Sequence, residues 1–248
     1  MANPYESERL VAEYLFFHYA AGDEVSGGLP VPHEALGFPA RVVGELVDPA
    51  RASRSALDLG CAVGRSSFEL ARISETVLGI DFSSAFIRAA ETLKRDGRLS
   101  CHVPVEGGRT APFTARLPAG IDAGRVRFET GDAMALRDGI GRSDIVLAAN
   151  LLCRLPEPRK FLERLPDLVS PGGQLLLATP FSWLPEFTAA EHWIGGRTAT
   201  GPSRDALFKL LDPHFELHLT KELPFLIREH SRKFQYGISL GSRWVRRP

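Results

Sequence analysis

Short apolar runs alternate with longer stretches of helical periodicity along most of this chain. Five such runs precede residue 180, and each leads into an acidic, amide or small residue. They cover residues 56–59, 76–81, 125–133, 143–150 and 170–179. Strands that alternate with helical segments favour a doubly wound α/β fold with a parallel sheet. Phe215–Leu219 and a run that begins near Lys233 or Phe234 add two strands, so we expect a mostly parallel seven-stranded sheet.

The segment before the first strand is predicted to cover the sheet. Residues 4–19 have helical periodicity and a wide apolar face, which must be buried against another part of the chain. Residues 22–38 are rich in Gly and Pro and are predicted as a loop, and residues 40–47 form a second predicted helix. We therefore expect residues 1–50 to form an N-terminal helical cap.

A hairpin is predicted between the second and third strands of the sheet. Residues 99–117 form two extended runs around a Gly-Gly turn, and Pro104 and Pro112 restrict both runs to sheet edges. We assign residues 98–124 as an inserted β-hairpin that covers a face or supports contacts in a homodimer. The strand signals follow one another without a linker, so residues 1–248 are expected to form one domain.

The composition is that of an ordinary globular protein and excludes several classes of partner. Acidic and basic residues are equal in number, and the pI is about 7.1. We therefore expect no binding to nucleic acid or membranes, and no apolar run approaches the roughly 18 residues of a membrane span. The polar N-terminus is unlike a signal peptide. The widely spaced Cys61, Cys101 and Cys153 predict neither disulfides nor a metal site and favour the cytoplasm.

The loop after the first strand carries the most informative chemistry. Gly60, Ala62 and Gly64 would let a ligand approach the backbone across the strand ends. A dinucleotide site favours G-x-G-x-x-G, but Ala62 and Arg65 occupy the second and third glycine positions. Asp58 would repel a pyrophosphate and attract a cation, which favours S-adenosylmethionine over NAD. The D-x-G-x-A-x-G arrangement resembles the first motif of class I S-adenosylmethionine-dependent methyltransferases, which implies their Rossmann-like fold.

Later strand ends extend this resemblance. Asp81 ends the second strand, where a carboxylate can accept hydrogen bonds from ribose hydroxyls. Asp132 and Ala133 match the adenine-contacting motif of the same family, and Asn150 follows the fourth strand, where the methyl donor would face the substrate. The predicted cofactor-binding residues are Asp58, Gly60, Cys61, Ala62, Gly64, Asp81, Phe82, Asp132, Ala133 and Asn150.

Segments outside these motifs resemble a narrower family. They are Asn3–Glu6 with Glu13–Tyr19, Thr179–Leu184 with Trp193 and Gly195–Gly196, and Pro224–Gln235. Together they resemble the 4-mercaptohistidine N1-methyltransferases of ovothiol biosynthesis. The resemblance implies metal-free transfer of a methyl group from S-adenosylmethionine to an imidazole nitrogen of 5-thiohistidine, giving ovothiol. The iron-dependent sulfoxide synthase half of bifunctional relatives is absent from this sequence, so a separate sulfoxide synthase would supply the thiolated histidine.

Other functions remain open from the sequence. Methylation of 5-selenohistidine on the way to ovoselenol would use a nearly identical chain. A methyltransferase for another small nucleophile would share every cofactor residue and differ only around the substrate. A non-catalytic S-adenosylmethionine-binding partner of a sulfoxide synthase is a further alternative, and Asp58 and Arg65 disfavour an NAD-dependent oxidoreductase.

The resemblance also implies roles on the substrate side. A nearby acceptor would help to remove the ring proton, and His18 and Glu229 are the candidates, with a core histidine as the alternative for His18. Arg154 or Arg228 would bind the substrate carboxylate, and Asn150 would hydrogen-bond its amine or ring. The apolar walls of the pocket are assigned to Tyr14, Tyr19, Phe181 and Trp183.

Overall fold

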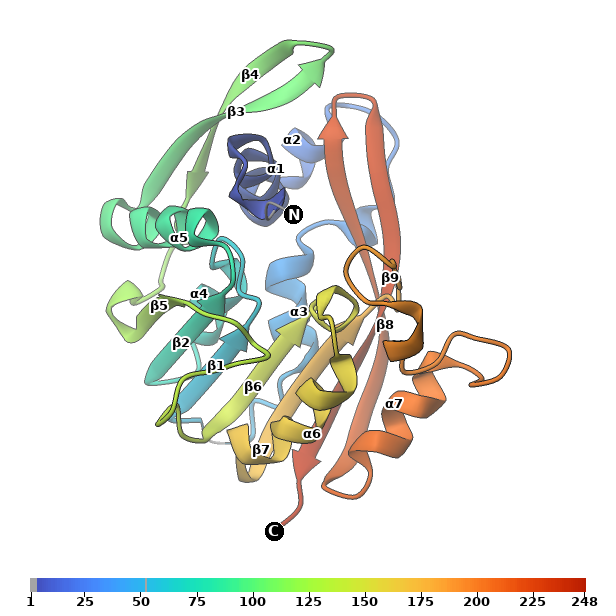
Figure 1. Cartoon of the computed structure of the whole chain (residues 1–248). Coiled ribbons are helices and arrows are strands. Elements are labelled where there is room, and N and C mark those ends of the chain that lie inside the picture. Colours follow the sequence, from blue (N-terminus) through green and yellow to red (C-terminus); the bar gives the residue numbers. More distant parts are fainter. Residues whose placement is uncertain (1–3, 52) are drawn as a thin grey trace.

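The central sheet has seven strands. The computed structural model describes residues 4–51 and 53–248, so Asn3 lies outside the described residues. The strand order is β5-β2-β1-β6-β7-β9-β8 (Figure 1). The bounds are β1 (Ser55–Leu59), β2 (Thr76–Asp81), β5 (Val126–Thr130), β6 (Ser143–Ala149), β7 (Val169–Thr179), β8 (Phe215–His230) and β9 (Lys233–Arg246). Strands β5, β2, β1, β6 and β7 are parallel, and β9 is antiparallel to β7 and β8, which confirms the predicted mostly parallel sheet.

The central parallel strands β1, β6 and β7 are buried on both faces, which explains why they are continuous apolar runs in the sequence. Successive side chains of a strand point to opposite faces. On β7, Leu176 and Ala178 belong to one core, and Leu175 and Leu177 belong to the other. The helices that complete the first core are α3 (Phe38–Leu46), α4 (Arg65–Leu70) and α5 (Ser84–Asp96), and those of the second are α6 (Pro158–Leu168) and α7 (Ser203–Leu211).

The N-terminal cap contains more structure than its sequence pattern indicates. Its elements are η1 (Pro4–Glu6), α1 (Glu8–Tyr19), α2 (Gly22–Ser26) and η2 (His33–Ala35). Residues 22–38 were predicted as a loop, but the carboxylate of Glu24 accepts the backbone N–H of Ala21 at 2.8 Å and begins α2. Gly27, at φ 55°, ends this helix. Capping chemistry therefore forms a five-residue helix that is too short for a periodic signal.

The predicted hairpin is present as β3 (Arg98–Glu106) and β4 (Arg109–Arg116), a separate two-stranded sheet. The ring of Phe113 packs against Phe16 of α1, with centroids 4.9 Å apart. At the tip of the β8–β9 hairpin, Ser231 donates from N and Oγ to the carbonyl oxygen of Val105 on β3, at 3.2 and 2.6 Å. Helix α1 thus lies between the two hairpins (Figure 1), and the insertion covers the cap.

Three 3-10 turns complete the described elements: η3 (Ala123–Arg125), η4 (Leu152–Arg154) and η5 (Ala190–His192). In the part of the chain that the structure describes, every helix is too short or too polar to cross a bilayer.

Candidate functional site

The carboxyl ends of the parallel strands open into one cavity of about 630 Å³. Residues that directly follow β1, β2, β5 and β6 line it, and α1 and the β8–β9 hairpin supply its other walls. Ligands of open α/β sheets bind at this edge, at the point where the strand order reverses. Within residues 4–51 and 53–248, no group of three or more His, Cys, Asp or Glu side chains could hold a metal ion.

The loop after β1 is fastened to β2. The backbone N–H of Gly60 donates to Ile80 O at 2.8 Å, and the N–H of Ala62 donates to Asp81 Oδ2 at 2.8 Å. Asp81 Oδ1 accepts the N–H of Ser83 at 2.8 Å. Ala62 has φ 48°, a strained conformation for a residue with a Cβ. Both oxygens of Asp81 are therefore fixed at the cavity, where each keeps a lone pair for a ligand hydroxyl.

Asp58 is a buried carboxyl group in the cavity wall. It is 1% exposed, and its Oδ2 accepts the hydroxyl of Ser67 at 2.6 Å. No ion pair neutralises it among the described residues. Burial raises the pKa of Asp58 to about 7, although the Ser67 bond opposes the shift. A positively charged group in the cavity would ionise this carboxyl and be attracted to it.

A flat apolar wall follows β2 and β5. Phe82 is 65% exposed, unusually high for a phenylalanine, and it lines the cavity with Ala133. Asp132, beside Ala133, accepts the N–H of Met134 on Oδ1 at 2.8 Å. Cys61 also lines the cavity, and burial raises the pKa of its thiol. These four predicted residues therefore share one cavity with Asp58 and Asp81.

Gly64 was predicted to bring the backbone close to a ligand, but it packs inside the protein. A Cβ at this position would lie 2.6 Å from the ring of Phe128, and Gly64 has φ 87°. It begins α4, and it is not among the residues that line the cavity. The need for a glycine here is therefore one of close packing and backbone conformation.

Helix α1 supplies His18 and Tyr14 to the cavity. His18 is 8% exposed, and its Nδ1 has no hydrogen-bond partner in the structure. Burial, together with the charge of Arg65, lowers the pKa of His18 to about 3. The ring is thus neutral with a free polar atom. Tyr14 packs against Phe86 at 4.7 Å between centroids, and burial raises the pKa of its hydroxyl.

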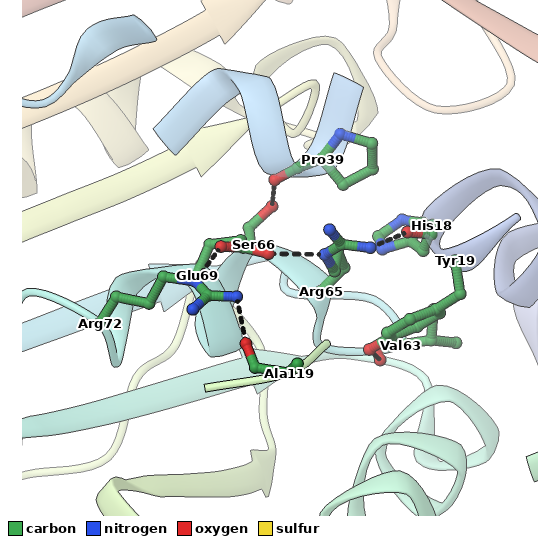
Figure 2. A network of polar contacts seen from close by, with 9 residues as sticks. All are labelled: His18, Tyr19, Pro39, Val63, Arg65, Ser66, Glu69, Arg72 and Ala119. Carbon is green, nitrogen blue, oxygen red and sulfur yellow. Dashed lines mark hydrogen bonds and ion pairs between the residues drawn. The ribbon is translucent and has the colours of Figure 1, made fainter. Parts of the chain in front are cut away.

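Arg65 joins the cap to the cofactor loop, a role that sequence reasoning missed. Figure 2 shows its guanidinium between α4 and the end of α1, where Nε donates to Glu69 at 2.9 Å and Nη1 donates to His18 O at 3.1 Å. The hydroxyl of Tyr19 donates to Val63 O at 2.8 Å (Figure 2). Tyr19 was predicted as a pocket wall, but this bond directs it to the loop and away from the cavity lining.

Two polar residues after β6 reach the cavity as predicted. Asn150, at φ 54°, accepts the hydroxyl of Ser239 on Oδ1 at 2.7 Å. Arg154 donates from Nη1 to Cys153 O and Ser182 O, at 3.1 and 3.2 Å. Its guanidinium lies 4.8 Å from the ring centroid of Phe187. Among the lining residues that the structure describes, Arg154 is the only arginine or lysine.

Two predicted aromatic walls lie elsewhere. Phe181 and Trp183 pack against the second core, while their neighbours Pro180 and Ser182 line the cavity. The indole N–H of Trp183 donates to Ser203 Oγ at 2.9 Å, which holds it against α7. The predicted segment therefore borders the cavity, but its side chains point the other way from the prediction: Pro180 and Ser182 face the cavity, and Phe181 and Trp183 face the core.

Arg228 and Glu229 also lie outside the cavity lining. Arg228 donates from Nη1 to Glu24 O at 2.7 Å and lies 5.2 Å from the ring centroid of Phe16. Ile227 lines the cavity in its place, because adjacent strand residues face opposite sides. Glu229 lines a separate groove, and its carboxylate binds Lys233 and Gln235 at 2.7 and 2.8 Å.

Sequence reasoning missed the β8–β9 wall of the cavity. Phe225, Ile227, Gln235 and Tyr236 all line it. Phe225 pairs with Gly237 and Ile227 pairs with Gln235, and this alternation along the two strands was a usable signal, since residues two apart on a strand share a face. Tyr236, between Gln235 and Gly237, does not follow it.

Residues 57–175 match a family model described as a methyltransferase domain. This match covers just under half of the chain and indicates a methyltransferase domain. The chain is 26% identical to a ubiquinone biosynthesis O-methyltransferase of Cupriavidus pinatubonensis over 130 residues, and this match covers 52% of the chain and 42% of that protein. It is 29% identical over 139 residues to an O-methyltransferase of Penicillium expansum, again 42% of that protein. The chain thus spans less than half the length of these curated relatives.

Solved structures of methyltransferases share the fold of this chain over nearly its whole length. Magnesium protoporphyrin IX methyltransferase from Synechocystis PCC 6803, with S-adenosylmethionine bound, has a TM-score of 0.54 at 18% identity, covering 99% of this chain and all of that one. The N-methyltransferase NodS of Bradyrhizobium japonicum, in complex with S-adenosylhomocysteine, has a TM-score of 0.51 at 16% identity, covering 96% and 98%. Both of these structures thus hold S-adenosylmethionine or its demethylated product.

Proposed function

We propose that this methyltransferase, taken as one domain of residues 1–248, methylates an imidazole nitrogen of 5-thiohistidine to give ovothiol. The observation that carries the proposal is the buried Nδ1 of His18, which has no hydrogen-bond partner and belongs to a residue of the cavity wall. A buried polar atom without a partner costs about 1–3 kcal/mol, which a hydrogen bond to a bound acceptor would offset.

The strand-end side of the cavity fits S-adenosylmethionine, which supplies a methyl group on a positively charged sulfur when it is bound. We assign its ammonium group to Asp58, the buried carboxyl without a cationic partner. Asp81 would accept from its ribose hydroxyls, and Phe82, Asp132 and Ala133 would contact its adenine. Gly60 contributes a side chain-free surface, because a Cβ there would already touch Leu151 at 3.0 Å.

The remaining polar groups fit a small amino acid. Arg154 is restrained by two carbonyl oxygens and by Phe187, and its remaining donors are available for a carboxylate. This assignment replaces Arg228, whose guanidinium is used within the protein. Asn150 would donate to the substrate from its NH2, since Ser239 occupies its oxygen. The volume of about 630 Å³ suits a cofactor with a small acceptor.

His18 would take the proton that the ring nitrogen loses on methylation. Its pKa of about 3 keeps the lone pair free at neutral pH. A bound thiolate would raise that pKa, because a negative charge nearby favours the imidazolium. The sulfur of the substrate is the softer nucleophile, so the walls around Tyr14 and Phe17 must hold it away from the methyl group while the nitrogen is aligned. Glu229 does not serve as this acceptor, since it faces a different groove.

An acceptor panel tests the proposal. Purified protein with S-adenosylmethionine is assayed by mass spectrometry on 5-thiohistidine, 5-selenohistidine, histidine and a catechol. We expect turnover of the first two and little of the others. The catechol tests the O-methyl transfer named for the curated relatives. Methylation of the catechol in preference to 5-thiohistidine would refute the proposed function, and absence of any transfer would favour a non-catalytic binding role.

The proposal places this enzyme after a sulfur-introducing reaction. A separate sulfoxide synthase would supply the thiolated histidine in the cytoplasm, where the three cysteines, all free thiols, would persist. A homodimer that uses the β3–β4 hairpin stays a prediction, which the mass of the protein in solution would test.

A further inference from the structure

Asn150 and Gln235 both line the cavity and both carry a side-chain amide. In each amide, either the oxygen or the nitrogen is already hydrogen-bonded to another residue. Ser239 Oγ donates to Asn150 Oδ1 at 2.7 Å, and Gln235 Nε2 donates to Glu229 Oε1 at 2.8 Å. The oxygen of the first amide and the nitrogen of the second are therefore engaged. A ligand meets the NH2 of Asn150 as a donor and the carbonyl oxygen of Gln235 as an acceptor.

Glu229 determines which side of Gln235 faces the cavity. A carboxylate only accepts hydrogen bonds, so the amide of Gln235 must turn its NH2 toward Glu229. Lys233 Nζ lies 2.7 Å from the other carboxylate oxygen. The bonds from Lys233 and Gln235 lower the pKa of Glu229, which keeps it ionised. The carboxylate that was predicted to act on the ring thus acts on a neighbouring amide.

One face of β9 supplies both amide systems. Gln235, Gly237 and Ser239 alternate along the strand and share a face. A Cβ at Gly237 would clash with the ring of Phe225, so this ring lies against Gly237, between the positions of Gln235 and Ser239 on the strand. Gln235 itself is exposed, and its amide is anchored by the carboxylate of Glu229.

Resting on the proposed function, we propose that Gln235 Oε1 binds the α-ammonium group of the amino-acid acceptor and that Glu229 is the positioning residue for Gln235. Arg154 would take the carboxylate of the same acceptor, so a donor and an acceptor at separate points of the cavity would recognise the two charged groups of an α-amino acid. Glu186 also lines the cavity and is the rival partner for the ammonium. Both residues are exposed, and we favour Gln235 because its bond to Glu229 fixes the direction of its amide, whereas solvent screens the charge of Glu186.

Steady-state kinetics with 5-thiohistidine and its analogue without the α-amino group test this assignment. Gln235→Leu should raise the KM of the thiohistidine acceptor about tenfold to hundredfold, as expected for a lost hydrogen bond to a charged group. It should leave the KM of the analogue and the Kd of S-adenosylhomocysteine near their wild-type values. Glu229→Leu should give a similar rise, and Glu229→Gln, which retains an acceptor oxygen, should restore most of the affinity. Lys233→Met, which removes the other partner of Glu229, is the matched control.

Two results would overturn the inference. One is an unchanged KM in Gln235→Leu, and the other is a rise in Glu186→Gln that matches or exceeds it. The ¹⁵N signal of the Gln235 side-chain amide, assigned by its loss in Gln235→Leu, is read without any acceptor. This signal should be shifted and slow to exchange in the wild-type protein and in Lys233→Met, but not in Glu229→Leu. An unshifted wild-type signal would refute the proposed orientation of the Gln235 amide toward Glu229, even if 5-thiohistidine is not a substrate. Failure of wild-type turnover alone refutes the proposed function.

Discussion

Asp58 should make the affinity for the cofactor depend on pH. Burial raises its pKa to about 7 in the protein without ligand. A bound ammonium group favours the carboxylate and lowers that pKa. Binding below pH 7 must therefore remove a proton from Asp58, which weakens the apparent affinity, whereas above pH 7 the carboxylate is already formed.

The size of the effect follows from that pKa. The apparent Kd is multiplied by 1 + 10^(7−pH), which is about elevenfold at pH 6, about twofold at pH 7 and about 1.1-fold at pH 8. Binding at pH 7 should release about half a proton, since about half of the Asp58 carboxyls are then protonated. The tenfold change between pH 6 and pH 8 corresponds to about 1.4 kcal/mol of binding free energy.

Isothermal titration calorimetry with S-adenosylhomocysteine measures both quantities. Titrations at pH 6, 7 and 8, each in two buffers with different ionisation enthalpies, give the Kd and the protons released. Asp58→Asn should bind more weakly at pH 8 and lose the pH dependence. Asp144→Asn is the matched control, since Asp144 accepts a backbone N–H from Arg54 at 2.8 Å and is not a cavity residue. A constant wild-type Kd from pH 6 to pH 8, or the same pH dependence of the Kd in Asp58→Asn, would show that ionisation of Asp58 is not coupled to cofactor binding.

Four further substitutions test three individual assignments. His18→Gln should lower kcat about 10²–10⁴-fold, the usual contribution of a general base, without changing the Kd of S-adenosylhomocysteine. An unchanged kcat would show that His18 is a core histidine without a part in proton transfer. Arg154→Met should raise the KM of the amino-acid acceptor about tenfold or more, whereas Arg228→Met should lower the Tm and leave that KM unchanged. The opposite pattern would restore Arg228 as the carboxylate ligand. Tyr19→Phe should weaken S-adenosylhomocysteine binding about two- to tenfold, because the Val63 carbonyl loses its donor. Equal affinity would show that the loop after β1 keeps its conformation without the Tyr19 hydroxyl.

The sheet and the cofactor side of the cavity could be predicted because both depend on local sequence. Each parallel strand is an apolar run, and the residue after it must lie at the same edge of the sheet. Asp58, Asp81 and Asn150 therefore reach the cavity as expected. Gly64 shows the limit of this logic, since its pattern matches the motif while its contacts with Phe128 are a matter of packing.

The substrate side depends on long-range contacts that a sequence pattern does not encode. Arg228 and Ile227 are neighbours, and only the pairing of β8 with β9 determines which of them faces the cavity. Arg228 is used by carbonyl oxygens some 200 residues away in the chain. The indole N–H of Trp183 is similarly bound to Ser203 Oγ, 20 residues away in the chain. A charged or aromatic residue in the right segment was thus recognised, but its direction was not.

The position of the transferred methyl group decides whether the protein methylates an imidazole nitrogen of 5-thiohistidine. Wild-type protein is incubated with 5-thiohistidine and S-adenosylmethionine that carries a ¹³C-labelled methyl group, and the product is examined by two-dimensional NMR. We expect long-range correlations from the protons of the labelled methyl group to two imidazole carbons, those that flank the methylated nitrogen, whereas a methyl group on sulfur would correlate with a single ring carbon. A labelled methyl group on the sulfur, or on an oxygen of another acceptor that is preferred over 5-thiohistidine, would contradict it.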